Sequence, residues 1–380
     1  MAAALLVSFS APSAAGADPA VGDQHVLIVL ATWGPQPFTP GDVSSSFAEA
    51  ARFYDKSSFH QLKLTATVTP WLPAFPGPVG CPDDLGDHVP TAFSSPPDAA
   101  AVAAGYRVES YDRVMYVTAR MACDWDGLGV GHQIVLNADR NWNDMVHELG
   151  HTYGLAHARR EQCRGCAKDE YGDPFSPMGH GLLDFSAYEK FQMGWLHEVA
   201  HISRAGTYAI GRPDIQGATP YALVIETGLH EYWIEQRLDA TPPGLVVRSI
   251  EPDLSDFMAA PELMLYVPAL TVGRGETFRI GGVFSVRYGP VGRVRFSWLD
   301  RTRPSAPTVS VGGARITWSS RDRGSGVASC SVALDGRTVG RGPASGSMTV
   351  PAPKSGMHRV SVTCVDRAGN RSRATVRRLA

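Results

Sequence analysis

The segment NDMVHELGHTYGLAHA (143–158) constrains this chain of 380 residues more than any other part of it. His147 and His151 are four residues apart, so on a helix their side chains lie one turn apart on the same face. Gly154 can adopt the positive φ that ends a helix, and the next three residues can bring His157 back to the same point. Three neutral imidazoles with an open fourth position are the ligand set of a catalytic zinc site. The sequence therefore predicts a helix that ends at a metal ion.

Glu148 follows the first histidine directly, where its carboxylate can reach a water bound to the metal. This position indicates a general base. Two alternatives stay open: a helix that merely carries two surface histidines, and a site whose third ligand is Glu170, further along the chain. The second alternative would leave Gly154 and His157 without a role, so the three-histidine site is preferred.

The segment HELGHTYGLAH resembles the zinc signature of the metzincin metalloproteases. Two later segments, YGDPFSPMGHG (171–181) and FSAYEKFQMGWL (185–196), are similar to the gametolysin (M11) family of that clan, as are GLGVG and IVLN upstream. The resemblance covers roughly residues 23–200. It implies a metzincin-like α/β catalytic domain, in which a mixed twisted sheet is combined with active-site helices.

The resemblance also implies roles for single residues. His147, His151 and His157 would be the ligands of one catalytic Zn²⁺, and Glu148 would be the general base. Met178 would be the methionine of the Met-turn, a hydrophobic floor beneath the zinc. Some metzincins have a tyrosine two residues after this methionine, but here the position is His180. Tyr171 and His180 are therefore candidate stabilisers of the transition state.

The chain before the motif alternates strand-like and helix-like segments. A buried strand is predicted over 25–30, an alternating strand over 62–68 and a further strand over 114–118. Asp42 can cap one helix, and Ser186 with Glu189 forms a capping box for another. The run GLGVG (127–131) predicts a Gly-rich edge strand ahead of a core strand. Such an edge can pair with an extended peptide, and the alternative is an edge strand without a ligand.

From about residue 201 the pattern changes to short strand-like runs between Gly and Pro turns, which is typical of all-β modules. The segment RTRPSAP (301–307) is a candidate linker. Beyond it, RGSGVASCSVALDG and VTCVDRAGNRS resemble bacterial immunoglobulin-like or fibronectin-type repeats, which implies a sandwich without chemistry of its own. The predicted organisation is a signal peptide (1–17), a zinc metalloprotease domain (18–200), a β-rich domain (201–303) and an Ig-like β-sandwich (304–380).

Two features predict secretion. Residues 1–17 are uncharged, contain an apolar run and end in Ala-Gly-Ala, as signal peptides do, although a positively charged start is missing. The 6 cysteines form an even number that can pair in an oxidising compartment. Proximity in sequence favours three pairs: Cys330–Cys364, Cys81–Cys123 and Cys163–Cys166. How Cys81, Cys123, Cys163 and Cys166 pair with one another is not determined by the sequence.

Charge and hydropathy exclude other classes of protein. With 35 Lys and Arg against 37 Asp and Glu, the chain lacks the bulk positive charge of a nucleic-acid binder. No apolar run approaches the roughly 18 residues of a transmembrane segment.

Residues 301–380 hold 14 Lys or Arg and 3 Asp, so attachment of this part to an anionic cell surface is a subsidiary hypothesis. The alternative is that the arginines reflect only a coding bias of the gene. The sequence also leaves open whether the protein binds a structural Ca²⁺.

The sequence thus predicts a secreted zinc metalloendopeptidase, a hydrolase whose partners are protein or peptide substrates from the cell exterior or cell wall. The rival hypothesis is a secreted binding or adhesion protein with an inactive protease-like domain. All four chemical residues are present, which argues against this rival. The chain has neither a G-x-S-x-G elbow nor a P-loop, so serine-hydrolase and NTPase chemistry has no support.

Overall fold

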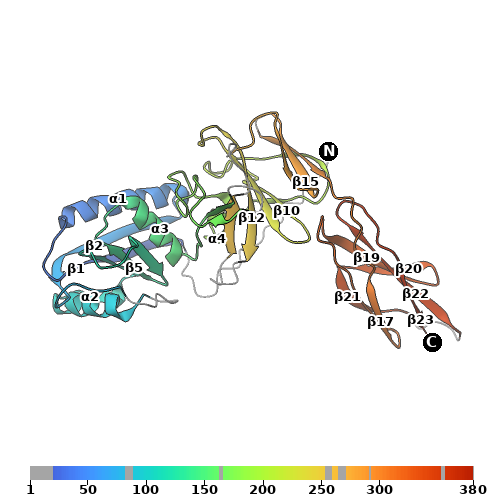
Figure 1. The fold of residues 1–380 in the computed structure, drawn as a ribbon, viewed down its shortest axis with the longest axis horizontal. Helices are drawn as coiled ribbons and strands as arrows, with labels where there is room; N and C mark the ends of the chain where they lie inside the picture. Colours follow the sequence, from blue (N-terminus) through green and yellow to red (C-terminus); the bar gives the residue numbers. More distant parts are fainter. Residues whose placement is uncertain are drawn as a thin grey trace.

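The computed structural model describes residues 20–81, 89–161, 166–252, 259–263, 271–290, 292–351 and 356–379. The predicted signal peptide (1–17) and Cys163 lie outside the described residues. An α/β part, a central β part and a C-terminal β part follow one another along an elongated molecule (Figure 1). None of the helices in the described residues combines the length and the apolar character needed to cross a membrane.

A five-stranded sheet organises the first part of the chain. Its strands are β1 (Gly22–Thr32), β2 (Leu62–Pro73), β3 (Arg113–Thr118), β4 (Gly127–Val130) and β5 (Gln133–Asn137), in the order β2-β1-β3-β5-β4. The first three strands and β5 are parallel, whereas β4 pairs antiparallel with β5 at the edge. The three strands predicted from the sequence and the Gly-rich edge strand are therefore confirmed.

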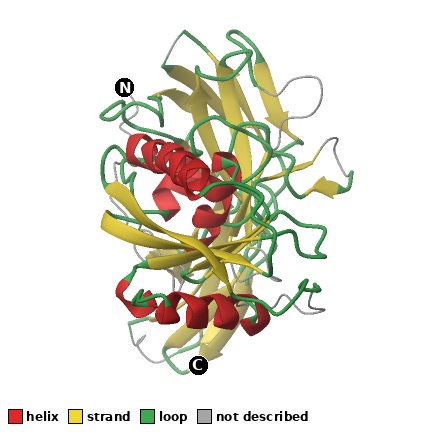
Figure 2. Ribbon diagram, turned by 90° about the vertical axis from the view of Figure 1, so that its left-hand side faces the viewer, coloured by secondary structure: helices red, strands yellow, loops and turns green. Residues whose placement is uncertain are grey.

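Helices cover both faces of this sheet (Figure 2). They are α1 (Pro40–Ser57), α2 (Thr91–Ala103) and α3 (Trp142–Thr152), with a short 3₁₀ helix at Val108–Ser110. Successive residues of β1 point to opposite faces. Val26, Ile28 and Leu30 pack in one core with α1 and α3, whereas Leu27 and Val29 pack in another with α2. A central strand buried on both faces explains why its sequence is a continuous apolar run.

The start of α1 differs from the prediction. Its N-cap is Thr39 and not Asp42. The Thr39 hydroxyl accepts the Asp42 N–H at 3.2 Å, and the Asp42 carboxylate accepts the Thr39 N–H at 2.9 Å, so the two residues form a capping box. Asp42 therefore acts in the first helical turn, where acidic residues are also favoured by the helix dipole. The capping box predicted for Ser186 and Glu189 is confirmed at α4 (Ala187–Gln192).

Two sheets make up the central part. The larger has seven strands in the order β7-β6-β13-β12-β11-β10-β8, with bounds β6 Arg159–Glu161, β7 Lys168–Asp169, β8 Ala200–His201, β10 Leu223–Glu226, β11 Glu231–Arg237, β12 Gly244–Pro252 and β13 Ala259–Leu263. The smaller, in the order β14-β15-β16-β9, consists of β9 Gly206–Ala209, β14 Thr277–Ile280, β15 Phe284–Tyr288 and β16 Arg293–Trp298. β6 and β7 precede residue 200, so the larger sheet crosses the boundary expected between the protease and β-rich domains.

The C-terminal part is a two-layer sandwich of antiparallel sheets. One sheet contains β17 (Thr308–Gly312), β18 (Arg315–Ser319) and β21 (Ser345–Thr349), and the other contains β19 (Val327–Leu334), β20 (Arg337–Gly342), β22 (His358–Asp366) and β23 (Thr375–Leu379). Their inner faces share one apolar core. The predicted sandwich architecture is present, and its Ig-like classification stays a prediction.

Disulfides are present in two parts of the molecule. Cys330 and Cys364 lie opposite each other on β19 and β22 and are bonded within the sandwich core. Cys81 is bonded to Cys123 beside the α/β sheet. Both of these predicted pairs are confirmed. Cys166 is also disulfide-bonded, and its predicted partner Cys163 lies outside the described residues.

Candidate metal centre

Helix α3 and the turn after it bring three histidines together. The Asn141 side chain caps the helix by accepting the Asn143 N–H at 3.2 Å. Met145, Val146 and Leu149 bury the face of α3 that packs against the sheet. The histidines therefore project from the other side of the helix. Gly154 ends it with a φ of 83°, as predicted, and the chain turns back toward the helix.

The three imidazoles meet through their Nε2 atoms. His151 Nε2 lies 3.1 Å from His147 Nε2 and 3.1 Å from His157 Nε2. Two nitrogens bound to one tetrahedral zinc at about 2.0–2.1 Å are about 3.3 Å apart, so these separations have the size that a zinc site requires. The prediction that the three histidines converge is confirmed in geometry.

The other ring nitrogens determine which tautomer each histidine has. His147 Nδ1 donates to the Pro177 carbonyl oxygen at 2.9 Å, and His151 Nδ1 donates to the Leu155 carbonyl oxygen at 2.8 Å. A carbonyl oxygen can only accept, so both Nδ1 atoms carry the proton and both Nε2 atoms carry a lone pair. Lone pairs that face each other at 3.1 Å repel unless a cation lies between them. The donor set therefore fits a zinc ion.

Burial keeps these imidazoles neutral, which is the form that binds a metal. Desolvation, together with its histidine neighbours, lowers the pKa of His151 to about 3. Desolvation and His147 lower the pKa of His157 to about 4. Desolvation also lowers the pKa of His147. The cluster is thus ready to accept a cation without first losing protons at neutral pH.

Glu170 lies behind the cluster and not in it. Its Oε1 is 2.7 Å from His157 Nδ1, on the side of the ring that faces away from the other two histidines. The alternative with Glu170 as the third ligand does not fit this arrangement, because His157 already stands between Glu170 and the centre. A carboxylate that accepts the Nδ1 proton of a ligand histidine fixes its tautomer and raises its basicity.

We expect Glu170→Ala to weaken zinc binding about tenfold, the lower end of the range for such outer partners, because 55% of the Glu170 side chain is exposed. The dissociation constant can be measured by competition with a chelator. Glu49→Ala on α1 removes a carboxylate of similar exposure, 51%, and should leave zinc affinity unchanged. Equal effects of the two substitutions would contradict a specific role for Glu170.

Glu148 is a residue of α3, and its side chain lies between this helix and the edge strand β4. Only 7% of Glu148 is exposed. Burial and the nearby Asp144 raise its pKa to about 8, although an N–H from Gly129 partly opposes the shift. A Cβ atom at Gly127 would collide with the Glu148 carboxylate, and one at Gly129 would collide with its backbone. The glycines predicted from the edge-strand pattern are thus required for the close approach of β4 to the helix.

Met178 lies directly beneath the helix that carries the first two histidines. It is fully buried, and a Cβ atom at Gly150 would collide with its sulfur. Its carbonyl oxygen accepts the N–H of Ala158, the residue after His157, at 2.8 Å. Met178 therefore packs beneath α3, and its role as the floor of a metal site stays a prediction.

Tyr171 and His180 both lie beside the cluster. The Tyr171 ring centroid is 4.2 Å from that of His157 and 5.8 Å from that of His180. Tyr171 is 37% exposed, so part of the residue can be reached from solvent. Desolvation raises the pKa of Tyr171, which keeps the hydroxyl protonated and able to donate.

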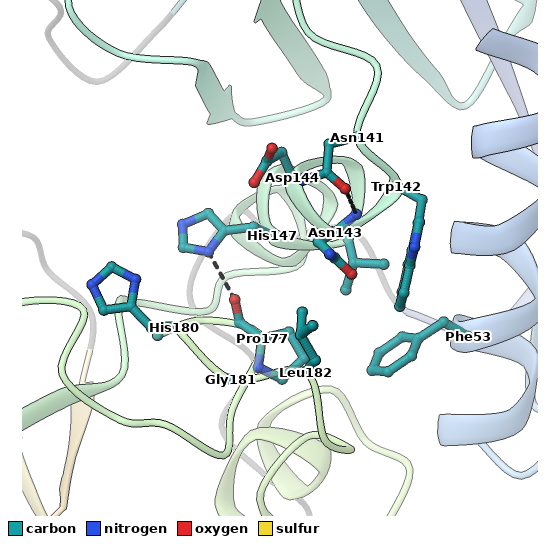
Figure 3. Close-up of a pocket in the computed structure, with 12 residues that line it drawn as sticks. Phe53, Asn141, Trp142, Asn143, Asp144, His147, Pro177, His180, Gly181 and Leu182 are labelled. Carbon is teal, nitrogen blue, oxygen red and sulfur yellow. Dashed lines mark hydrogen bonds between the residues drawn. The ribbon is translucent and has the colours of Figure 1, made fainter. Parts of the chain in front are cut away.

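A pocket of about 190 Å³ opens next to His147. Its walls are α3 and the loop 177–182, and Phe53 of α1 contributes to its lining. Figure 3 shows His147 donating to the Pro177 carbonyl at this wall, with Trp142 and Leu182 near Phe53. The pocket is large enough for one amino-acid side chain and is continuous with the histidine cluster through His147.

Three carboxylates outside this centre also lie close together. Asp300, Asp322 and Asp366 have oxygens within 4.8 Å of one another, where the C-terminal part begins. Hydrogen bonds from neighbouring backbone groups hold each of them. An acidic cluster does not by itself define a cation site, so the structural Ca²⁺ left open by the sequence stays a prediction.

Residues 42–218 match the family described as gametolysin peptidase M11. The resemblance stated from the sequence is therefore confirmed over this region, and the match supports a metal-dependent peptidase. A search of curated proteins finds no match.

Solved structures show only weak likeness. Fibronectin(III)-like modules of CbhA from Clostridium thermocellum align with a TM-score of 0.19 and 14% identity, covering 41% of this chain and 86% of that one. The glycoside hydrolase domain of Endo-D from Streptococcus pneumoniae R6 aligns with a TM-score of 0.20 and 11% identity, covering 99% of this chain and 94% of that one. At such TM-scores neither likeness carries an argument about fold or function.

Proposed function

We propose that the protein is a secreted zinc-dependent metalloendopeptidase, from the premise that residues 42–218 match the gametolysin (M11) peptidase family. Its substrates would be extracellular or cell-wall proteins. The observation that carries the proposal is the meeting of three neutral imidazoles through their Nε2 atoms, with His151 Nε2 3.1 Å from each of the other two. Such a donor set suits Zn²⁺, with one coordination position left open for water or substrate.

Each residue of the site then has a chemical task. Zinc bound to the three histidines would lower the pKa of a water ligand and polarise the scissile carbonyl. Glu148 takes a proton from the attacking water and delivers it to the leaving amine. Its raised pKa suits a group that must both accept and release a proton near neutrality. The hydroxyl of Tyr171, or the ring of His180, donates to the oxygen on which negative charge develops.

The substrate is proposed to bind in extended form along β4. This strand is at the edge of its sheet, so one side of its backbone has no strand partner among the described residues. An extended peptide can add to such an edge through main-chain hydrogen bonds. The pocket beside His147 would receive the side chain that follows the cleaved bond, because it opens between α3 and the loop after Met178.

Zinc content and proteolysis together test this proposal. Purified protein should contain close to one zinc per chain and should hydrolyse casein or gelatin. 1,10-Phenanthroline should abolish the hydrolysis, and added Zn²⁺ should restore it. A folded protein that contains no zinc and cleaves no unfolded substrate would instead support the rival hypothesis of an inactive binding protein.

Secretion is proposed because the chain forms disulfides in the α/β part and in the sandwich. Disulfides persist in oxidising compartments and are rare in the cytosol. The signal peptide predicted over residues 1–17 would provide the route.

We further expect the C-terminal part to attach the enzyme to an anionic surface. Its 14 Lys or Arg against 3 Asp make binding electrostatic and sensitive to salt. The full chain should bind an anionic matrix at low ionic strength and elute at high ionic strength, whereas a chain ending at residue 303 should not bind. Retention of the shortened chain at low salt would contradict the hypothesis.

A further inference from the structure

The segment that carries His157 is part of the central sheet. β6 begins two residues after His157 and pairs with β13 in parallel. Ala158 lies between His157 and β6. It donates its N–H to the Met178 carbonyl oxygen at 2.8 Å, and its own carbonyl oxygen accepts the N–H of Asp173 at 3.1 Å. The third histidine is therefore held by a backbone that is bonded both to the sheet and to the loop around Met178.

Asp173 connects this loop to the next layer of the protein. It is fully buried. Its Oδ2 accepts a hydrogen bond from Arg248 Nε at 2.8 Å and forms an ion pair with Arg248 Nη2 at the same distance, and its Oδ1 accepts the Phe175 N–H at 2.8 Å. Its carbonyl oxygen accepts the N–H of His180 at 3.0 Å. Asp173 thus joins the two ends of the loop 173–180 through its backbone and ties the loop to Arg248 through its side chain.

Arg248 reaches this loop from β12 of the central sheet. It is 1% exposed. Its Nη1 donates to Glu235 of β11, and the other oxygen of Glu235 accepts the N–H of Ala187 at the start of α4 at 2.6 Å. Burial alone would lower the pKa of Arg248, but the charges of Asp173 and Glu235 outweigh it and keep the pKa above its ordinary value. Arg248 is therefore a buried charged group that is paired with two carboxylates, of the kind whose loss leaves a buried carboxylate without a partner.

The loop that Arg248 holds contacts two parts of the metal centre. The Pro177 carbonyl accepts the Nδ1 proton of His147 at 2.9 Å and so orients its ring. Met178 fills the space beneath α3 at Gly150. A shift of the loop would turn the His147 ring and disturb the floor of the site, because the loop contacts His147 directly through Pro177 and packs directly against α3 through Met178.

We propose that Arg248 is a positioning residue for the metal centre and that the central sheet is a structural component of the peptidase and not a separate module. The inference rests on the proposed zinc site. It explains the place of a fully buried arginine from β12 beside the loop after the third histidine. Arg248 contacts neither metal nor substrate, so it acts through Asp173 and the loop 173–180.

The test compares substitutions at two buried arginines in the full chain. Arg248→Lys keeps the positive charge but loses the hydrogen bond from Nε to Asp173, and Arg248→Met loses both. Arg237→Lys is the matched control: Arg237 lies on β11, is fully buried and pairs with the same Glu235 at 3.6 Å. Its hydrogen bonds go to Asp184, Phe185 and Asp239 instead of Asp173, so the control separates the contact with Asp173 from the contact with Glu235. Zinc affinity by chelator competition and the visible spectrum of the Co²⁺-substituted protein are measured for each variant.

We expect Arg248→Met to weaken zinc binding about 10–100-fold and to change the Co²⁺ spectrum, with partial rescue in Arg248→Lys. Arg237→Lys should keep the parent values even where it lowers thermal stability. If Arg248→Met does not fold, the zinc affinity and Co²⁺ spectrum of Arg248→Lys and Asp173→Asn test the positioning role instead.

Parent-like zinc affinity and spectrum in folded Arg248 variants, or equal shifts in Arg237→Lys, would overturn the inference. Absence of zinc from the parent protein would instead overturn the proposed function.

Discussion

Glu148→Gln is expected to lower kcat by about 10²–10⁴-fold while the protein keeps its zinc, because the substitution removes a general base and retains the shape of the side chain. Glu148 is 7% exposed and its carboxylate fits between α3 and β4, so an isosteric amide should be accommodated there. Steady-state kinetics on a fluorogenic peptide and metal analysis of the same preparation check the two halves of this expectation.

Asp144→Asn provides the matched control for this substitution. Asp144 lies one turn earlier on α3, and its charge acts on Glu148 without replacing it. Removing that charge should have a much smaller effect on kcat than removing the base. If Glu148→Gln retained parent-like hydrolysis, or if both variants lost activity equally, the assignment of the base would be wrong.

The parts of the site that could be predicted from sequence all depend on local spacing. A helix fixes His147 and His151 one turn apart whatever surrounds it. Gly154 fixes the end of that helix, and the few residues to His157 limit where its ring can go. The strands of the α/β sheet were predictable because a strand buried on both faces must be apolar throughout.

Helix α2 was missed because its sequence contains Ser94-Ser95-Pro96-Pro97, which ordinarily marks a loop. Tertiary packing overrides this local preference: Phe93 and Ala101 are fully buried against the α/β sheet. Contacts of this kind cannot be deduced from the segment itself.

The partners behind the metal site were missed for a related reason. Asp173 and Arg248 are 75 residues apart, and their pairing depends on how β6 joins the central sheet. A very short strand such as β6 gives almost no periodic signal. Glu170 was noticed as a ligand candidate, but only the fold could show that it faces the outer nitrogen of His157.

The decisive comparison for the metal centre is between His157→Ala and Glu170→Ala. If His157 is the third ligand, its loss should weaken zinc binding far beyond the tenfold expected for Glu170→Ala, and hydrolysis should fall below detection. A site with Glu170 as ligand predicts the reverse order, and two surface histidines predict little effect from either change. His180→Ala is the control, because His180 is an exposed histidine of the same region that lies outside the converging cluster. Chelator competition on all three variants ranks the affinities, and a His157→Ala protein that binds zinc as tightly as the parent would exclude the three-histidine site.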